Sequence, residues 1–222
     1  MGASSGFPID LILFGMIAVF LVLRLRSVLG RRTGFERPAQ PYQPPQPQRP
    51  GPVIDAKAEP VPAPSTRKLP DPASPIGQTL SRFRNFDRNF DPGSFLEGAE
   101  RAFRMIVAAF ASGDRAALQG LLTKDTYAAF DGAISARERA GQVQVSEIRA
   151  IQSVAIESAE LHGSVASVTM RIVSDQVSYT KDSTGHIIVG TDAVTEITDL
   201  WTFERDLSNA DPTWRLAGAH SA

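Results

Sequence analysis

A change of hydrophobic pattern at Gly141 constrains the fold more than any other feature of the sequence. Before it, apolar residues recur at helical spacing from Ser94 to about Arg139. After it, apolar and polar residues alternate, as in the run 168–173 and the run 197–203. Helices followed by antiparallel strands predict an α+β domain over residues 94–222, with the helices packed on one face of a curved sheet.

The first pattern predicts three helices. Ser94 and Glu97 have the spacing of a capping box, which predicts the start of a helix that ends near Gly113. A second, short helix is expected over 114–122 and a third over 124–139.

The second pattern predicts a series of strands. They are expected at 143–156, 168–173, 186–190 and 197–203, with a last short strand from Trp214 toward Ala219.

An apolar segment near the N-terminus predicts a membrane anchor. The apolar run is residues 11–23, and the extended segment 7–29 approaches the roughly 20 residues that span a bilayer. Four arginines follow this run and are predicted to lie at the membrane interface: Arg24, Arg26, Arg31 and Arg32. The positive-inside bias then places the N-terminus outside and the rest in the cytoplasm, as a single-pass protein of a bacterial inner membrane. A cleaved signal peptide is the alternative, but no Lys or Arg precedes the run and no convincing cleavage site follows it.

Residues 30–77 are predicted to be a basic, then proline-rich, disordered linker. Thirteen of the 16 prolines lie between Pro38 and Pro75. Proline removes backbone donors, and the few large apolar residues here leave little to bury.

The segment 78–93 is expected to be an amphipathic element that precedes the domain. Aromatic and basic residues are interleaved in it: Phe83, Phe86 and Phe90 with Arg82, Arg84 and Arg88. Helical spacing would place the three aromatics on one face. The favoured interpretation is that this face folds back onto the domain. The functional alternative is a basic helix that contacts the membrane surface or a partner.

Charge and composition exclude several functions. Residues 81–222 carry fourteen Lys or Arg against nineteen Asp or Glu, which argues against binding to a nucleic-acid backbone. The chain has no cysteine, and His162, His186 and His220 are far apart, so we expect no metal and no cofactor.

Several stretches resemble one known domain family. The opening matches lie at 95–99, 110–114 and 118–122, and the closing matches are the run Asp199-Leu200-Trp201-Thr202-Phe203-Glu204-Arg205 and the triplet Trp214-Arg215-Leu216. Together they resemble the C-terminal domain of the mitochondrial import-motor scaffold, the forty-four-kilodalton subunit of the inner-membrane translocase. The stretch 23–34 resembles the bacterial, TimA-type anchored members of this family.

The resemblance implies a nuclear-transport-factor-two-like cone at an inner membrane, in contact with membrane lipids. The mitochondrial relatives hold a heat-shock-70-type chaperone at the import channel through a charged N-terminal region. This chain has a spanning segment and a proline-rich linker in that place.

The family residues are expected to be structural. Trp201, Phe203 and Trp214 are of the kind that fills a core, and Asp199 is expected to pair with Arg205 or Arg215.

Cone-shaped domains of this superfamily include isomerases with a buried carboxylate. Asp175, Glu196 and Asp199 are the acids in strand-like sequence that could serve as such a base. We expect no catalytic residue, because no constellation of partners accompanies them.

Two functional hypotheses follow. The first is an anchored adaptor that positions protein partners, a translocase or chaperone among them, at the cytoplasmic face of the membrane. The second is a pocket protein for a lipid or another apolar ligand. A homodimer is a third option, because open sheets of this superfamily often pair.

Overall fold

The computed structural model describes residues 65–222. The predicted anchor at 7–29, its arginines Arg24, Arg26, Arg31 and Arg32, and the linker up to residue 64 lie outside the described residues. Within the described part, none of the helices has the length and apolar character that crossing a membrane requires.

A five-stranded sheet in the order β1-β2-β3-β4-β5 forms one layer of the domain. Strands β2 (Val143–His162), β3 (Val165–Lys181), β4 (Ile187–Asp206) and β5 (Arg215–Ser221) are antiparallel neighbours, and the short β1 (Thr66–Lys68) pairs in parallel with β2. The predicted antiparallel sheet is therefore confirmed. The stretches 186–190 and 197–203, predicted as separate strands, lie in the single strand β4.

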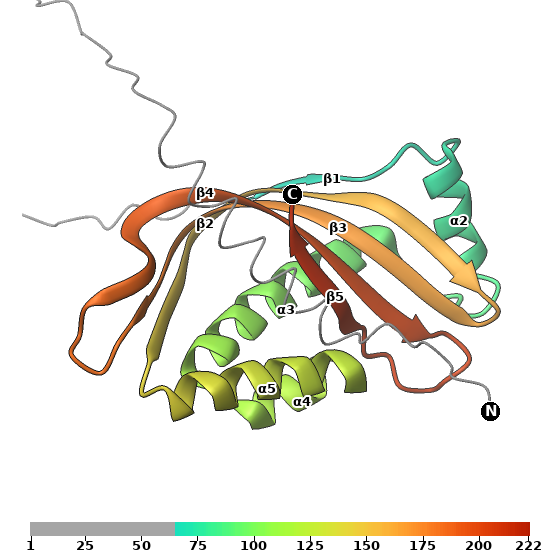
Figure 1. The fold of residues 1–222 in the computed structure, drawn as a ribbon. Helices are drawn as coiled ribbons and strands as arrows, with labels where there is room; N and C mark the ends of the chain where they lie inside the picture. The colour runs from blue at the N-terminus through green and yellow to red at the C-terminus, as the bar shows by residue number, and fades with distance from the viewer. Residues whose placement is uncertain (1–64) are drawn as a thin grey trace, which may run out of the picture. The chain divides into compact units, whose positions relative to one another are not determined.

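Irregularities in strand pairing accompany the curvature of the sheet. Three register shifts interrupt the β2–β3 pairing, near Ala150, Ser153 and Ser158. Extra residues of this kind bend a strand and increase its twist. Figure 1 shows the long strands arching over the helices, so the sheet has a concave, helix-covered side.

The pairing of β3 with β4 is offset at one place. Gln176 lies opposite Thr195, but Ser178 lies opposite Thr191, so β4 has two more residues than β3 in this interval. Gly190 adjoins the offset with φ +81°, and a Cβ there would lie 2.2 Å from the Ser178 carbonyl oxygen. Strand β5 pairs with β4 only from Asp199 to Glu204.

Helices α3 (Pro92–Ser112), α4 (Arg115–Leu121) and α5 (Lys124–Arg139) cover the concave side. The predicted bounds of α4 and α5 are confirmed to within one residue, and Gly113 ends α3 in the left-handed conformation. The predicted capping box at Ser94 is wrong. Asp91 is the N-cap, and its carboxylate accepts a hydrogen bond of 2.7 Å from the Ser94 amide. Pro92 can stand in the first turn because the amide it lacks would have no partner there.

The core lies between α3 and the sheet. Phe95, Leu96, Phe103 and Ile106 of α3 are buried, and α3 packs chiefly on β2. The Phe103 ring lies 4.7 Å from the Trp201 ring in an edge-to-face arrangement. Burial of large apolar side chains such as these is the main force that holds helices to a sheet.

The segment before α3 is structured differently from the prediction. Helix α2 (Pro75–Phe83) begins before residue 78 and ends at Phe83, so Phe86 and Phe90 lie in the following loop. The three aromatics therefore do not share a helical face. Phe83 and Phe90 are buried in the core, whereas Phe86 is 47% exposed.

Residues 65–77 were expected to end the disordered linker, but they form β1, a turn and the start of α2. Pro75 occupies the first turn of α2, where proline is favourable. A high proline content therefore does not make this stretch disordered. Within the described residues the domain therefore already includes β1 and α2, ahead of the expected start at residue 94.

Candidate functional site

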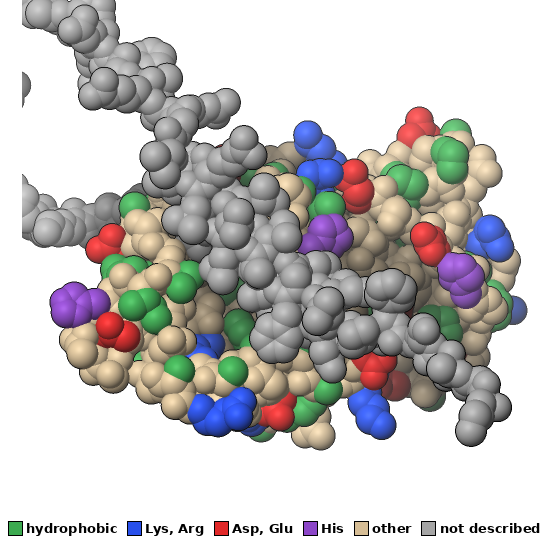
Figure 2. Space-filling view, in the orientation of Figure 1, with side chains coloured by type: hydrophobic (Ala, Val, Ile, Leu, Met, Phe, Trp, Pro, Cys, Tyr) green, Lys and Arg blue, Asp and Glu red, His purple; other side chains and the backbone are tan. Residues whose placement is uncertain are grey.

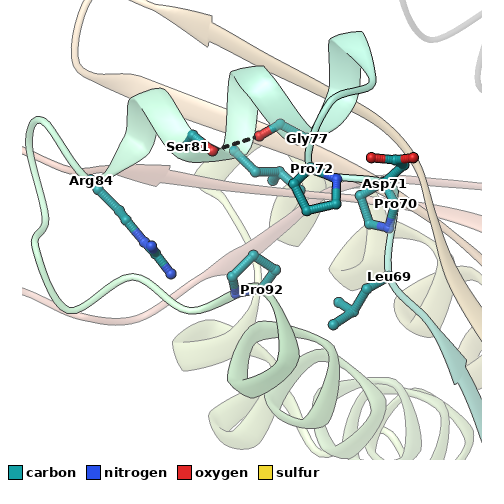
Figure 3. Close-up of a pocket in the computed structure, with 9 residues that line it drawn as sticks. Leu69, Pro70, Asp71, Pro72, Gly77, Ser81, Arg84 and Pro92 are labelled. Atoms are coloured by element: carbon teal, nitrogen blue, oxygen red, sulfur yellow. Dashed lines mark hydrogen bonds between the residues drawn. The ribbon is translucent and has the colours of Figure 1, made fainter.

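A surface groove lies where the β1–α2 connection passes the start of α3. Its volume is about 630 Å³. Its apolar lining comes from Leu69, Pro70, Pro72, Gly77, Leu80 and Pro92, and its polar side chains are Asp71, Ser81 and Arg84. Figure 3 shows Arg84 toward one end of this group and Asp71, with Pro70 and Leu69, toward the other, while Pro72 and Pro92 lie between them. The groove is thus apolar along its length and carries opposite charges near its ends.

The turn that forms one wall is fixed by local hydrogen bonds. The Asp71 carboxylate accepts from the Ala73 amide at 2.8 Å, and its carbonyl accepts from the Ser74 hydroxyl at 2.6 Å. Ser74 is also the N-cap of α2, where its hydroxyl accepts from the Gly77 amide at 3.1 Å. These contacts, with the fixed φ of Pro70 and Pro72, shape the wall before any ligand binds.

Gly77 allows the turn and the helix to approach closely. A Cβ at this position would lie 2.2 Å from the Asp71 carbonyl oxygen and 2.7 Å from the Pro72 Cα. The Ser81 hydroxyl donates to the Gly77 carbonyl at 2.9 Å, as Figure 3 shows. A glycine is required here by space rather than by a positive φ.

The sequence singled out Arg82, Arg84 and Arg88, and all three are exposed. Arg82 lies in α2, Arg84 lines the groove, and Arg88 lies in the loop that follows α2. None of them has an ion pair within 4 Å among the carboxylates of residues 65–222. The Arg84 Nε donates to the Phe90 carbonyl at 3.1 Å, which leaves its two terminal nitrogens for other partners. Figure 2 shows that charges of both signs are interspersed over the visible face of the molecule.

Phe83 and Phe90 belong to an aromatic cluster rather than to a surface. Their rings lie 5.1 Å apart, and the Phe95 ring lies 4.8 Å from the Trp214 ring. Trp214 also faces Phe83, at 6.3 Å. The loop after α2 is thereby anchored to the start of α3 and to the approach to β5.

The family residues lie in two separate places. Trp201 and Phe203 are buried in the core, and Trp214 packs against it. Arg205 forms an ion pair of 2.8 Å with Asp87, and Arg215 forms one of 2.7 Å with Asp211. Glu204 is half-buried opposite Arg215 in the β4–β5 register.

The expected pairing of Asp199 with Arg205 or Arg215 is wrong. Six residues along a strand cover roughly 20 Å, which is beyond the reach of the Asp199 and Arg205 side chains. Arg215 lies at the same end of β5 as Arg205 does of β4. The Asp199 carboxylate instead accepts hydrogen bonds from Gln176 at 3.1 Å and from Ser221 at 3.2 Å.

Asp199 is part of a polar group on the inner face of the sheet. Gln176 is 6% exposed and Ser174 is fully buried, and the Gln176 amide also donates to the Ser174 hydroxyl at 2.9 Å. Burial raises the pKa of the Asp199 carboxyl, while the hydrogen bonds from Ser221 and Gln176 oppose that rise. The group ties β3, β4 and β5 together at the end of the sheet opposite Arg205.

The three candidate acids do not form one site. Asp175 and Glu196 are register partners on the outer face of the sheet, whereas Asp199 faces inward. The Asp175 carboxylate accepts from the Gln152 amide at 2.6 Å, and Glu196 is exposed.

The three histidines also lie apart. His162 ends β2, His186 precedes β4 and His220 lies in β5. In the described part of the chain, no group of three or more His, Asp or Glu is arranged to hold a metal ion.

The groove was not predicted, because most of its lining residues lie in the segment that was predicted to be a linker. One signal was present: Ser74 followed by Pro75 is a helix start, with an N-cap side chain and a proline in the first turn.

Comparison with known proteins places the chain in a family. The model of the Tim44-like domain matches residues 76–221, which is more than half of the chain. The chain therefore belongs to the Tim44-like domain family, which confirms the expected relationship of its C-terminal domain. The resemblance of residues 23–34 to the TimA-type anchored members stays a prediction. No curated protein sequence matches it.

Solved structures with a similar arrangement have low sequence identity. The intermembrane-space region of the chloroplast protein ARC6 is 13% identical with a TM-score of 0.44, covering 60% of this chain and 97% of that one. A putative dehydratase of the NTF2-like family from Streptomyces avermitilis is 13% identical with a TM-score of 0.36, covering 59% and 97%. A conserved protein from Planctomyces limnophilus is 14% identical with a TM-score of 0.35, covering 58% and 94%.

Proposed function

We propose that this protein is a membrane-anchored adaptor without catalytic activity. Its Tim44-like domain would hold a protein partner, a translocase or chaperone being the class that the family suggests, at the cytoplasmic face of an inner membrane. The apolar segment 7–29 would supply the anchor. The proline-rich segment would supply an extended linker between the membrane and the domain. Membership of the Tim44-like family supports a role in protein translocation.

The groove between the β1–α2 turn and the start of α3 is the observation that carries this proposal. It is open, lined largely by apolar side chains, and built on a turn fixed by its own hydrogen bonds. A surface that is already ordered loses little conformational freedom on binding, so more of the contact energy becomes affinity. These are the properties of a binding surface for a protein segment.

The inner carboxylate is better suited to holding the sheet together than to proton transfer. Asp199 has a raised pKa, but its two oxygens already accept hydrogen bonds from Gln176 and Ser221. A general base must also face the substrate and a group that stabilises the developing charge. Beyond its polar neighbours Gln176 and Ser174, the inner face of the sheet carries the aromatic and aliphatic residues of the core.

Site-specific photocrosslinking of the full-length protein in cells tests the adaptor proposal. A photoreactive residue at Leu69, which is 56% exposed in the groove, should capture a defined protein. The matched control is Val143, which is 59% exposed at the first residue of β2. Figure 1 shows that β2 starts at the end of the sheet away from α2. Identical adducts at both positions, or none above background at Leu69, would contradict the proposal.

An apolar ligand is the second candidate, and the groove itself favours it. A volume of about 630 Å³ with apolar walls lies within the range of small-molecule sites, roughly 300–1,000 Å³. Native mass spectrometry of the protein from cells distinguishes the two functions. A retained lipid that is lost when Leu69 in the groove is replaced by Ser would favour the ligand over the protein partner.

A further inference from the structure

The geometry points to a specific partner chemistry: the groove takes an extended apolar segment that carries a carboxylate, and Arg84 receives that carboxylate. This inference rests on the proposed adaptor function and specifies its partner. Three features support it: the apolar lining of the groove, the terminal nitrogens of Arg84, which pair with no carboxylate of residues 65–222, and the hydrogen-bond and ion-pair partners of the nearby acids.

The apolar part of the groove suits an extended segment. Leu69, Pro70, Pro72 and Pro92 present rigid or exposed apolar surface along it, and Leu80 forms its buried floor. Proline side chains offer flat apolar faces, and their backbone has no amide that would need a partner. A segment with aliphatic or proline side chains can therefore bury apolar surface here at little polar cost.

Arg84 is held in place but not neutralised. The hydrogen bond from its Nε to the Phe90 carbonyl fixes one edge of the guanidinium. Its terminal nitrogens have no carboxylate within 4 Å among residues 65–222. A guanidinium that is already oriented can form a bidentate pair with a carboxylate at a lower entropic cost.

The acids nearest to Arg84 have other partners. Asp87 is paired with Arg205 at 2.8 Å, and Asp91 caps α3 through the Ser94 amide. The hydrogen bonds from Ser94 are the main cause that lowers the pKa of Asp91, and the positive charge of Arg84 lowers it further by a smaller amount. Asp71, at the far end of the groove, accepts from the Ala73 amide. Within residues 65–222 these acids therefore leave Arg84 available to pair with a carboxylate from a partner.

An anionic membrane could also meet exposed arginines, but the surroundings favour a peptide. A membrane-binding helix needs apolar side chains on the same exposed face. Phe83 and Phe90, which might have served, are buried, and only Phe86 is exposed. The groove offers a concave apolar surface instead, which receives apolar side chains rather than inserting its own.

Three peptide pools test the inference. Each pool contains decapeptides with the same randomised Leu, Ile, Val and Pro positions, and with either Glu, Gln or Lys at three fixed positions. Binding is measured by fluorescence anisotropy to the full-length protein in nanodiscs of neutral phosphatidylcholine. The Glu pool should bind about three- to tenfold more tightly than the Gln pool, and the Lys pool most weakly. Equal binding of the Glu and Gln pools overturns the inference.

Variants assign the effect to the groove. Arg84→Gln should bring the ratio between the Glu and Gln pools close to 1, while Leu69→Ser should weaken both pools alike. Arg101→Gln, an exposed arginine on the outer side of α3, is the matched control and should change neither. A ratio that survives Arg84→Gln overturns the assignment.

The remaining outcomes separate this inference from the adaptor proposal. If Leu69 crosslinks a protein in cells but the pools show no charge preference, the adaptor proposal stands and the partner chemistry is wrong. If neither occurs, both fail. If Arg84→Gln lowers binding to phosphatidylglycerol vesicles and leaves the pool ratio unchanged, the arginine serves a lipid surface and the inference is overturned.

Discussion

The carboxylate of Asp87 lies 2.8 Å from the guanidinium of Arg205, although 118 residues separate them in the chain. Both side chains are largely buried, at 19% and 11% exposure. Arg205 also donates from its Nε to the Asp211 carbonyl at 3.1 Å. One arginine of β4 therefore holds both the loop after α2 and the turn before β5.

Asp87→Asn should lower the free energy of unfolding by about 2 kcal/mol, because it leaves a largely buried guanidinium without its charged partner. Chemical denaturation followed by tryptophan fluorescence measures this, since Trp201 and Trp214 both pack in the domain. Glu157→Gln, which breaks the more exposed pair with Arg171, is the control and should have little effect. Equal effects of the two substitutions would refute the structural role given to Asp87.

Phe83→Ala and Phe86→Ala should differ sharply. Phe83 is fully buried, so its truncation should cost about 3–5 kcal/mol of stability. Phe86 is 47% exposed, and its truncation should change stability by less than about 0.5 kcal/mol. Thermal denaturation of the two variants tests this. A larger loss for Phe86 would mean that the loop after α2 packs differently.

Two helical glycines should respond in opposite directions to alanine. Gly77→Ala forces the new Cβ against the Asp71 carbonyl, so the turn must move and stability should fall by about 1–3 kcal/mol. Gly120→Ala in α4 meets no atom within 4 Å, so the helix propensity of alanine should raise stability by up to about 1 kcal/mol. Denaturation midpoints measure both. Stabilisation by both substitutions would contradict the close approach at Gly77.

Stability should depend on pH through Asp199 in the sense opposite to an ordinary salt-bridged acid. Burial raises the pKa of this carboxyl in the folded state above the usual value of 3.8. The folded state therefore keeps this proton to higher pH than the unfolded state does. The contribution of Asp199 to the free energy of unfolding is therefore fully present at low pH. It falls as pH rises from about 4 through the raised pKa of the folded state.

Asp199→Asn isolates this contribution, because several other acids titrate in the opposite sense. The pKa of Asp91, for example, is lowered by its hydrogen bonds to Ser94. The stability of the natural chain relative to the Asp199→Asn variant should decline between pH 3 and pH 7. A constant difference across that range would show that the folded and unfolded pKa values of Asp199 are alike.

The elements that follow from local sequence were predicted well. The bounds of α5 and the end of α3 at Gly113 depend on helical periodicity and on a residue that favours the left-handed conformation. The alternation after Gly141 likewise predicts the strands, because one face of the sheet is buried.

The site could not be predicted because it depends on contacts that local patterns do not encode. Asp199 was assigned an arginine partner from charge alone, but its position along β4 places it far from Arg205 and next to Gln176 and Ser221. The groove depends on the turn at Asp71 approaching Gly77, which only three-dimensional packing reveals. Proline content suggested disorder in a stretch where prolines occupy a turn and a helix start.

The offset between β3 and β4 also bears on self-association. A straight strand at a sheet border presents a regular ladder of free amides and carbonyls, onto which another chain can add. Two surplus residues interrupt that ladder just where β5 no longer covers β4. The interruption should discourage strand addition at this border, so that neighbouring copies of the domain would not polymerise through it.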